Sequence, residues 1–140
     1  IEWFDAQGRR WLRTGDVGRF DEDGFIVLGD RKKDMIISGG FNIYPSDIEA
    51  ELAQHPEVRE CSVIGVASRE WGETPVAYVV ARDAGRNPAE LGAEVKAWLN
   101  GRVGKTQRVA DLVMVDSLPR SEIGKVLKRD LREMYKGSVA

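Results

Sequence analysis

Cysteine and histidine are almost absent: the 140 residues include one of each, Cys61 and His55. A lone cysteine cannot form an internal disulfide, and its place in the apolar run 61–64 predicts a buried thiol in a reducing compartment. No group of cysteine, histidine and carboxylate residues has the spacing of a metal site. These absences argue against a disulfide scaffold, a metal centre and a nucleophile activated by histidine.

The chain also lacks long apolar runs and an excess of one charge. Its apolar runs, such as residues 76–81, are far too short to cross a bilayer, and no secretory leader stands at the start. The net charge of −2 offers no basic field for nucleic acid or an anionic membrane. We therefore expect a cytoplasmic protein with no transmembrane segment and no nucleic-acid partner.

What is present suits one compact domain, with 42% apolar residues for a core and 31% charged residues for a surface. Residues 17–20 and 25–28 flank a turn that closes with Asp23-Gly24, which predicts a hairpin. A second hairpin is predicted around Gly39-Gly40. The polar segment 29–34 between the two hairpins reads as a linker.

Helices and strands are predicted to alternate over the rest of the chain. Ser46 and Glu49 fit a capping box that opens a helix ending near His55. The other predicted elements are strands at 61–67, 76–81 and 112–115, a helix opened by Asn87-Pro88 with Leu91, Val95, Trp98 and Leu99 on one face, and a last helix with Leu127, Leu131, Met134 and Tyr135 on one face. This order predicts an α+β fold, with a small antiparallel sheet flanked by helices and preceded by a β-hairpin segment.

Three polar segments with glycines are not explained by core packing. In Arg13-Thr14-Gly15-Asp16, the carboxylate could accept from ribose hydroxyls, although an ordinary Asx turn is the plainer reading of this segment taken alone. In residues 30–42, Arg31 offers donors suited to phosphate or ribose oxygens, and the glycine pair lets a ligand approach the backbone. A solvated charge run is the plainer reading of that segment.

The third segment, residues 118–129, places Lys125 on a loop bracketed by Pro119 and Gly124, just before the last helix. Such a lysine can reach into a cleft as a point charge for phosphate oxygens. A solvated lysine in the first turn of a helix is the alternative, at a slight cost from the helix dipole. Trp71, in a polar loop, reads either as a lid over the sheet edge or as a binding surface.

Together, these segments resemble motifs of the adenylate-forming superfamily, which contains acyl-CoA synthetases, nonribosomal peptide synthetase adenylation domains and firefly luciferase. Residues 11–16 resemble the W-[FLY]-x-T-G-D element, residues 29–45 the D-R-x-K-[DE] hinge motif, and residues 119–129 the P-[RK]-x-x-x-G-K lysine motif. The three motifs occur in the family order and cover nearly the whole chain. The sequence is therefore identified as similar to the C-terminal domain of an acyl-CoA synthetase.

This resemblance implies an AMP-forming acid–thiol ligase, in which a carboxylate attacks ATP to give an acyl-adenylate and CoA then displaces AMP. Lys125 would be the catalytic lysine of the first step, stabilising charge as pyrophosphate leaves. The nucleotide would be bound by Asp16, Arg31 and Asn42. The domain would rotate about Lys33 between the two steps, and CoA would be bound by Ser38, Gly39, Gly40 and Trp71.

The same resemblance implies that much of the enzyme lies outside this chain. Residues 1–30 would form the edge of the N-terminal AMP-binding domain, residues 31–33 the hinge, and residues 34–140 the mobile domain. The expected partners are a carboxylic acid, ATP, CoA and the N-terminal domain, where the ligands of Mg²⁺ would lie. The chain alone is expected to be inactive.

Two positions depart from the family pattern, and two other functions stay open. Gly104 stands where many CoA ligases carry an aromatic residue, and Asp47 replaces a glutamate. An adenylation domain that acylates a carrier protein is one alternative, but residues 124–129 fit the CoA ligases better than its G-K-[IV]-D-R pattern. A non-catalytic α+β interaction module is the other alternative.

Overall fold

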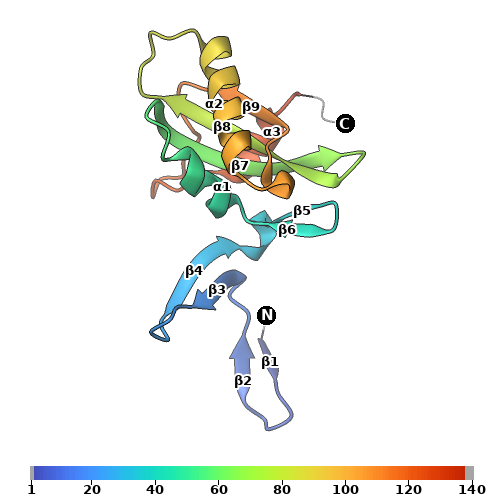
Figure 1. Ribbon diagram of the computed structural model, residues 1–140. Helices are drawn as coiled ribbons and strands as arrows, with labels where there is room; N and C mark the ends of the chain where they lie inside the picture. Colours follow the sequence, from blue (N-terminus) through green and yellow to red (C-terminus); the bar gives the residue numbers. More distant parts are fainter. Residues whose placement is uncertain (1, 138–140) are drawn as a thin grey trace. The chain divides into compact units, whose positions relative to one another are not determined.

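The structure, a computed structural model, describes residues 2–137 and consists of two compact units, residues 1–33 and the residues from Asp34 onward. The first unit contains two separate antiparallel hairpins, drawn in blue in Figure 1. Their strands are β1 (Glu2–Phe4), β2 (Arg10–Leu12), β3 (Asp16–Phe20) and β4 (Ile26–Arg31). Among residues 2–137, each of these hairpins is thus a ribbon of two strands.

The β3–β4 hairpin was predicted from its turn. The Asp21 carboxylate accepts from the amides of Asp23 and Phe25, at 3.0 and 2.8 Å, and Gly24 has a φ of +85°. The β1–β2 hairpin was not predicted. Its turn depends on the Asp5 carboxylate, which accepts from the Arg9 amide at 2.9 Å. Carboxylates that bond to nearby amides commonly replace Asn-Gly or Asp-Gly chemistry in such turns.

The second unit holds a five-stranded sheet and all three α-helices of the described residues (Figure 1). Its elements are η1 (Lys32–Asp34, which begins in the first unit), β5 (Ile36–Ser38), β6 (Phe41–Ile43), α1 (Pro45–Leu52), β7 (Val58–Ser68), β8 (Gly72–Ala81), α2 (Pro88–Arg102), η2 (Lys105–Gln107), β9 (Asp111–Met114) and α3 (Lys128–Met134). The predicted α+β class is confirmed. Strand β9 runs parallel to β8 whereas the other pairings are antiparallel, so the sheet is mixed.

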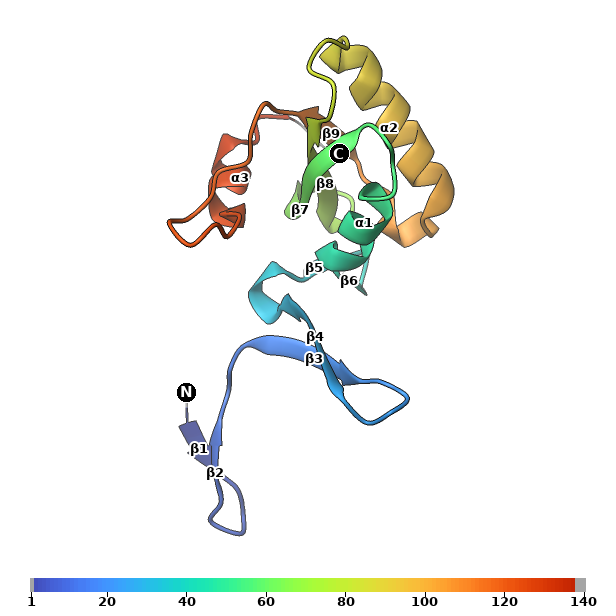
Figure 2. The same cartoon turned by 90° about the vertical axis from the view of Figure 1, so that its left-hand side faces the viewer.

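Both faces of this sheet are covered, as Figure 2 shows, with α1 and α2 on one side and α3 on the other. Side chains alternate between the faces of a strand, so neighbours enter different cores. Val63 packs with the residues under α1 and α2, whereas Ile64 packs with Leu131 of α3. The predicted apolar face of α2 is confirmed, since Leu91, Val95 and Leu99 are buried.

Three local predictions differ from the structure. Helix α1 begins at Pro45, so Ser46 lies inside it and is not the N-cap, and Glu49 bonds Lys128 instead of closing a capping box. Proline at the first helical position fixes φ and supplies this helix start without a side-chain cap. Residues 29–34 form the end of β4 and η1 rather than an irregular linker.

The third difference concerns the last helix. It is shorter than predicted, because Leu127 is its N-cap and Tyr135 follows its last turn. Met134, which was predicted on the apolar face, is half exposed. The Lys128 ammonium ties this helix to the edge of the sheet, at 2.9 Å from both the Glu49 carboxylate of α1 and the Val63 carbonyl of β7. Within residues 2–137, no helix is long and apolar enough to cross a bilayer.

Candidate functional site

The structure pairs Asp16 with Arg31 in the first unit. Asp16 begins β3 and Arg31 ends β4, and the two residues are partners in the strand register. The Arg31 Nε lies 3.0 Å from Asp16 Oδ1, and both side chains keep substantial exposure to solvent. The carboxylate is therefore oriented by a cationic partner while it stays accessible to a ligand, as a group that accepts from vicinal hydroxyls must be.

Lys33 lies in η1 and is exposed. The next residue, Asp34, is the first of the second unit, and its carboxylate is largely buried. Its Oδ1 lies 3.1 Å from the Arg132 guanidinium of α3. This ion pair therefore ties the first residue of the second unit to its last helix.

The turn Gly39-Gly40, between β5 and β6, is braced by the turn between β7 and β8. The Gly39 amide donates to the Trp71 carbonyl at 2.8 Å. Gly39 has a φ of +57°, and a Cβ at this position would lie 2.9 Å from the Trp71 indole. Both conditions require glycine, because an L-residue would be strained and would also displace the indole. Trp71 itself is half exposed.

Glu73 provides a second brace for this turn. Its Oε2 accepts a hydrogen bond from the Ile37 amide of β5 at 2.9 Å. The register between β5 and β8 pairs Ser38 with Gly72 and gives Ile37 no partner on β8, so the Glu73 side chain bonds its amide instead. Ser38, the last residue of β5, is opposite Phe41, and Asn42 of β6 is opposite Ile37 and exposed. The structure thereby places the predicted residues 38–42 and Trp71 on two adjoining turns.

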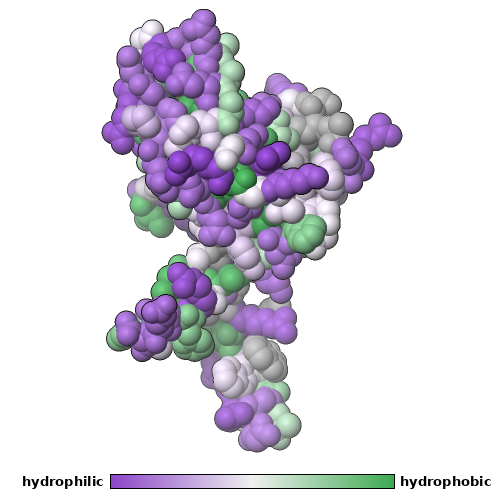
Figure 3. Space-filling model, in the orientation of Figure 1, coloured by the Kyte–Doolittle hydropathy of each residue, from purple (hydrophilic) through white to green (hydrophobic). Residues whose placement is uncertain are grey.

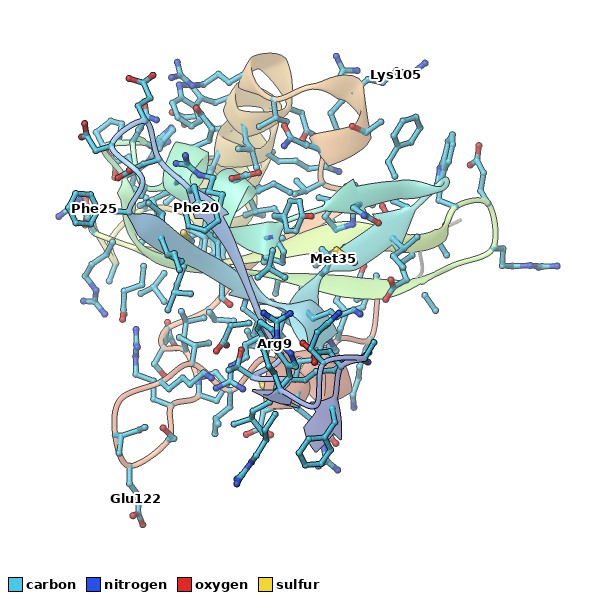
Figure 4. All side chains as sticks on the ribbon, turned by 90° about the horizontal axis from the view of Figure 1, so that it is seen from below. Arg9, Phe20, Phe25, Met35, Lys105 and Glu122 are labelled. Atoms are coloured by element: carbon cyan, nitrogen blue, oxygen red, sulfur yellow. The ribbon has the colours of Figure 1, made fainter. Side chains whose placement is uncertain are left out.

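Lys125 ends a closed turn that precedes α3. The Ser121 amide donates to the Lys125 carbonyl at 2.8 Å, and the Gly124 amide donates to the Ser121 carbonyl at 2.9 Å. Gly124, with φ of +85°, has nothing within 4 Å of an added Cβ, so backbone conformation alone requires glycine there. Figure 4 shows Glu122, in the same turn, projecting outward from the body of the second unit. Lys125 is exposed.

The candidate residues thus form two contacting pairs, Asp16 with Arg31 and Gly39 with Trp71. Among the residues that the structure describes, no hydrogen bond or ion pair joins the Lys125 ammonium to another candidate. Residues 2–137 contain no group of three or more histidine, cysteine or acidic residues that could hold a metal ion.

Two groups that pack against the cores of the second unit, Cys61 and Tyr135, have strongly raised pKa values. Burial, and then the nearby Glu49 carboxylate, raise the pKa of the Cys61 thiol to about 12. Burial, followed by the hydrogen bond to Asp111, raises the pKa of Tyr135 to about 12. A thiol with such a pKa is protonated at neutral pH and is a poor nucleophile.

Residues 47–125 match the family model described as the AMP-binding enzyme C-terminal domain. The match covers more than half of the chain and ends at Lys125. The chain belongs to the AMP-binding enzyme C-terminal domain family. The predicted superfamily is confirmed, and the α1-to-Lys125 portion of the second unit is the part that carries the match.

Proteins that resemble this AMP-binding enzyme C-terminal domain include CoA ligases. The chain is 43% identical over 124 residues to the 2-succinylbenzoate–CoA ligase of Geobacillus kaustophilus (89% of this chain, 25% of that protein). It is 44% identical over 123 residues to the long-chain-fatty-acid–CoA ligase of Yersinia pestis (88% and 21%). Its fold matches the crystal structure of ATP-bound MatB from Rhodopseudomonas palustris with a TM-score of 0.81 and 40% identity (95% and 25%). The chain spans about a quarter of the length of these proteins or less.

Two residues that brace the candidate turns, Glu73 and Arg120, were assigned no site role from the sequence. Glu73 follows Trp71-Gly72 and could have been noticed from that neighbourhood, but its partner Ile37 lies 36 residues away. Arg120 is part of the lysine motif, and its partner Glu60 lies on β7, 60 residues away. Only the fold reveals such partners, because nothing local in the sequence links them.

Proposed function

We propose that this chain is the C-terminal part of an AMP-forming acyl-CoA synthetase. The enzyme would activate a carboxylic acid with ATP to an acyl-adenylate and then transfer the acyl group to CoA. The observation that carries the proposal is Lys125, an exposed ammonium at the end of a closed, glycine-dependent turn, at the last residue of the family match. The CoA-ligase relatives support the choice of CoA as the acceptor.

In the first step, the acid's carboxylate attacks the α-phosphorus of ATP and pyrophosphate leaves with the P–O bonding pair. Lys125 would stabilise the negative charge that develops on the phosphate oxygens, without transferring a proton. Asp16 would accept from the ribose hydroxyls, and Arg31 would hold the Asp16 carboxylate in place, as their 3.0 Å contact supports. Asn42 would provide a further polar contact to the nucleotide.

In the second step, the CoA thiol attacks the acyl carbonyl and AMP leaves. The mobile domain, residues 34–140, would rotate about the hinge 31–33, centred on Lys33, so that a different face meets the adenylate. Ser38, Gly39, Gly40 and Trp71 would then line the path of the CoA arm. The bracing of this turn by Trp71 and Glu73 supports the assignment, since a narrow passage needs a fixed wall.

The complete reaction would require the N-terminal AMP-binding domain, of which residues 1–30 would be the edge. That domain would supply the acid pocket and the ligands of Mg²⁺, and this chain alone would be inactive. A cytoplasmic location would suit a ligase that uses ATP and CoA, and the half-buried thiol of Cys61, which forms no disulfide, is compatible with a reducing compartment.

The test uses the full-length parent enzyme and a panel of acids that includes a long-chain fatty acid and 2-succinylbenzoate. Acid-dependent ATP–pyrophosphate exchange reports the first step, and thioester formation from the supplied acyl-adenylate reports the second. Lys125→Ala should lower exchange about 100- to 1,000-fold and leave the second step unchanged. The exposed Lys136 provides the matched control, Lys136→Ala, which should alter neither step.

Unchanged exchange in Lys125→Ala would contradict the proposal, because Lys125 would then be an ordinary surface lysine. If the wild-type parent showed no exchange with any acid of the panel, a non-catalytic interaction module would be favoured. Exchange without thioester formation would favour a carrier-protein thiol as the acceptor.

A further inference from the structure

The turn that carries Lys125 has a side-chain clamp in addition to its backbone hydrogen bonds. Arg120 and Val126 form a bridge at its base, and the Leu127 amide donates to the Pro119 carbonyl at 2.9 Å. The Arg120 side chain folds over this base. Its Nη1 donates to the Gly124 carbonyl at 2.7 Å, and that carbonyl belongs to the peptide unit joining Gly124 to Lys125.

The other end of the Arg120 guanidinium is fixed to the sheet. Its Nη2 donates to Glu60 Oε1 on β7. A single planar group therefore bridges the peptide unit before Lys125 and a carboxylate on the central sheet. Hydrogen bonds from a charged donor are stronger than neutral ones, and two of them from one guanidinium restrict its orientation.

We infer that Arg120 is a positioning residue for Lys125, acting through the Gly124 carbonyl with Glu60 as its anchor. The inference rests on the proposed role of Lys125 in adenylate formation. Glycine can adopt many backbone conformations, and the Gly124–Lys125 peptide plane sets the direction in which the Lys125 side chain leaves the chain. By holding the carbonyl of that plane, Arg120 limits how far the ammonium can depart from the reacting phosphate.

Stability alone does not explain this clamp. The side chains of Arg120 and Glu60 are 41% and 31% exposed, and ion pairs with that degree of exposure contribute little to the stability of the fold. The effect of removing Arg120 should therefore appear in the first chemical step rather than in thermal unfolding. A misplacement of a charged group by about 1 Å can lower a rate about 100-fold.

The experiment compares Arg120→Ala, Glu60→Ala and the double variant in the full-length parent, using the acid that supports exchange in the wild type. We expect kcat for ATP–pyrophosphate exchange to fall about 10- to 100-fold in Arg120→Ala and by less in Glu60→Ala, with the KM for ATP little changed. The double variant should be no slower than Arg120→Ala, since both groups act through one contact. Thioester formation from supplied acyl-adenylate and the thermal midpoint should stay at wild-type values.

The matched control is Arg86→Ala. It removes another partly exposed arginine–glutamate pair, Arg86 with Glu94 at 2.8 Å, on a different side of the unit, and should leave exchange unchanged. The inference is overturned if Arg120→Ala keeps wild-type exchange while Lys125→Ala loses it, or if both steps and the thermal midpoint fall together. It is also overturned if Glu60→Ala has no effect while Arg120→Ala does, since Arg120 would then act on the substrate directly. If Lys125→Ala itself kept wild-type exchange, the result would instead contradict the proposed function.

Discussion

The two units differ in where they place their apolar residues. In the first unit, no residue from 4 to 33 whose burial the structure describes is fully buried, and Phe20, Phe25 and Leu28 are largely exposed. Figure 3 shows such hydrophobic residues, in green, at the surface of this unit, and Figure 4 labels Phe20 and Phe25 near the outer end of the β3–β4 hairpin. The second unit instead buries two clusters, one on each face of its sheet.

This difference means that the second unit supplies the stability of the fold, although candidate ligand groups lie in both units. Isolated two-stranded hairpins are at best marginally stable in water, because they bury too little apolar surface. Asp16 and Arg31 therefore lie on a segment with little stability of its own, whereas Lys125 and the Gly39-Gly40 turn extend from a packed unit.

Cutting the chain after Lys33 should give the largest effect. A polypeptide of residues 34–140 should unfold cooperatively on heating, because both of its cores are complete within it. A peptide of residues 1–33 should show no cooperative transition by circular dichroism. A folded peptide, or an unfolded second unit, would contradict the comparison.

Truncation of one leucine in each unit should give the next largest effect. Leu99→Ala opens a cavity in the core beneath α2 and should lower the free energy of unfolding by about 2–5 kcal/mol. Leu28→Ala, at a largely exposed position in β4, should change it by about 0.5 kcal/mol or less. Urea denaturation of the whole chain measures both variants, and equal losses would argue against the proposed division of stability.

Gly39→Ala should have a smaller effect, of roughly 1–3 kcal/mol, because it combines a left-handed backbone with displacement of the Trp71 indole. The matched control is Gly15→Ala in the first unit, where φ is +80° and nothing lies within 4 Å of an added Cβ. That change should scarcely alter urea denaturation of the packed unit. In the Trp71→Ala background, Gly39→Ala should cost less, and an unchanged cost would show that the indole contact is unimportant.

The smallest effect on the fold concerns the thiol of Cys61. Its raised pKa means that the folded chain holds the proton more tightly than the unfolded chain, so this contribution to stability is present below about pH 9 and is lost as the pH rises towards about 12. Native Cys61 should resist iodoacetamide at mildly alkaline pH and react only after urea is added. A cysteine introduced by Glu22→Cys, on the exposed β3–β4 turn, should react at once.

Local turn chemistry explains why most elements could be predicted from the sequence. Asp23-Gly24 and Gly39-Gly40 mark hairpins that the structure contains, and Asn87 caps α2 by accepting from the Ala89 and Glu90 amides. The predicted start of α1 was wrong because proline, rather than a capping side chain, begins that helix. In both cases the deciding residues are close in sequence.

The remaining features depend on contacts between distant residues. The parallel pairing of β9 with β8, the contact of Gly39 with Trp71 and the anchoring of Arg120 by Glu60 all require the completed sheet. Nothing in the neighbourhood of Glu60 indicates an arginine 60 residues away. The sequence could therefore indicate which segments carry candidate ligand groups, but not which side chains hold those segments in place.

The Asp34–Arg132 ion pair has a topological consequence. It joins the first residue of the second unit to its last helix, across 98 positions of the sequence. The polypeptide therefore enters this unit beside the place where its final helix lies. Closing this long loop of the sequence reduces the conformational freedom of the intervening chain, so the start of the unit and α3 are coupled to each other.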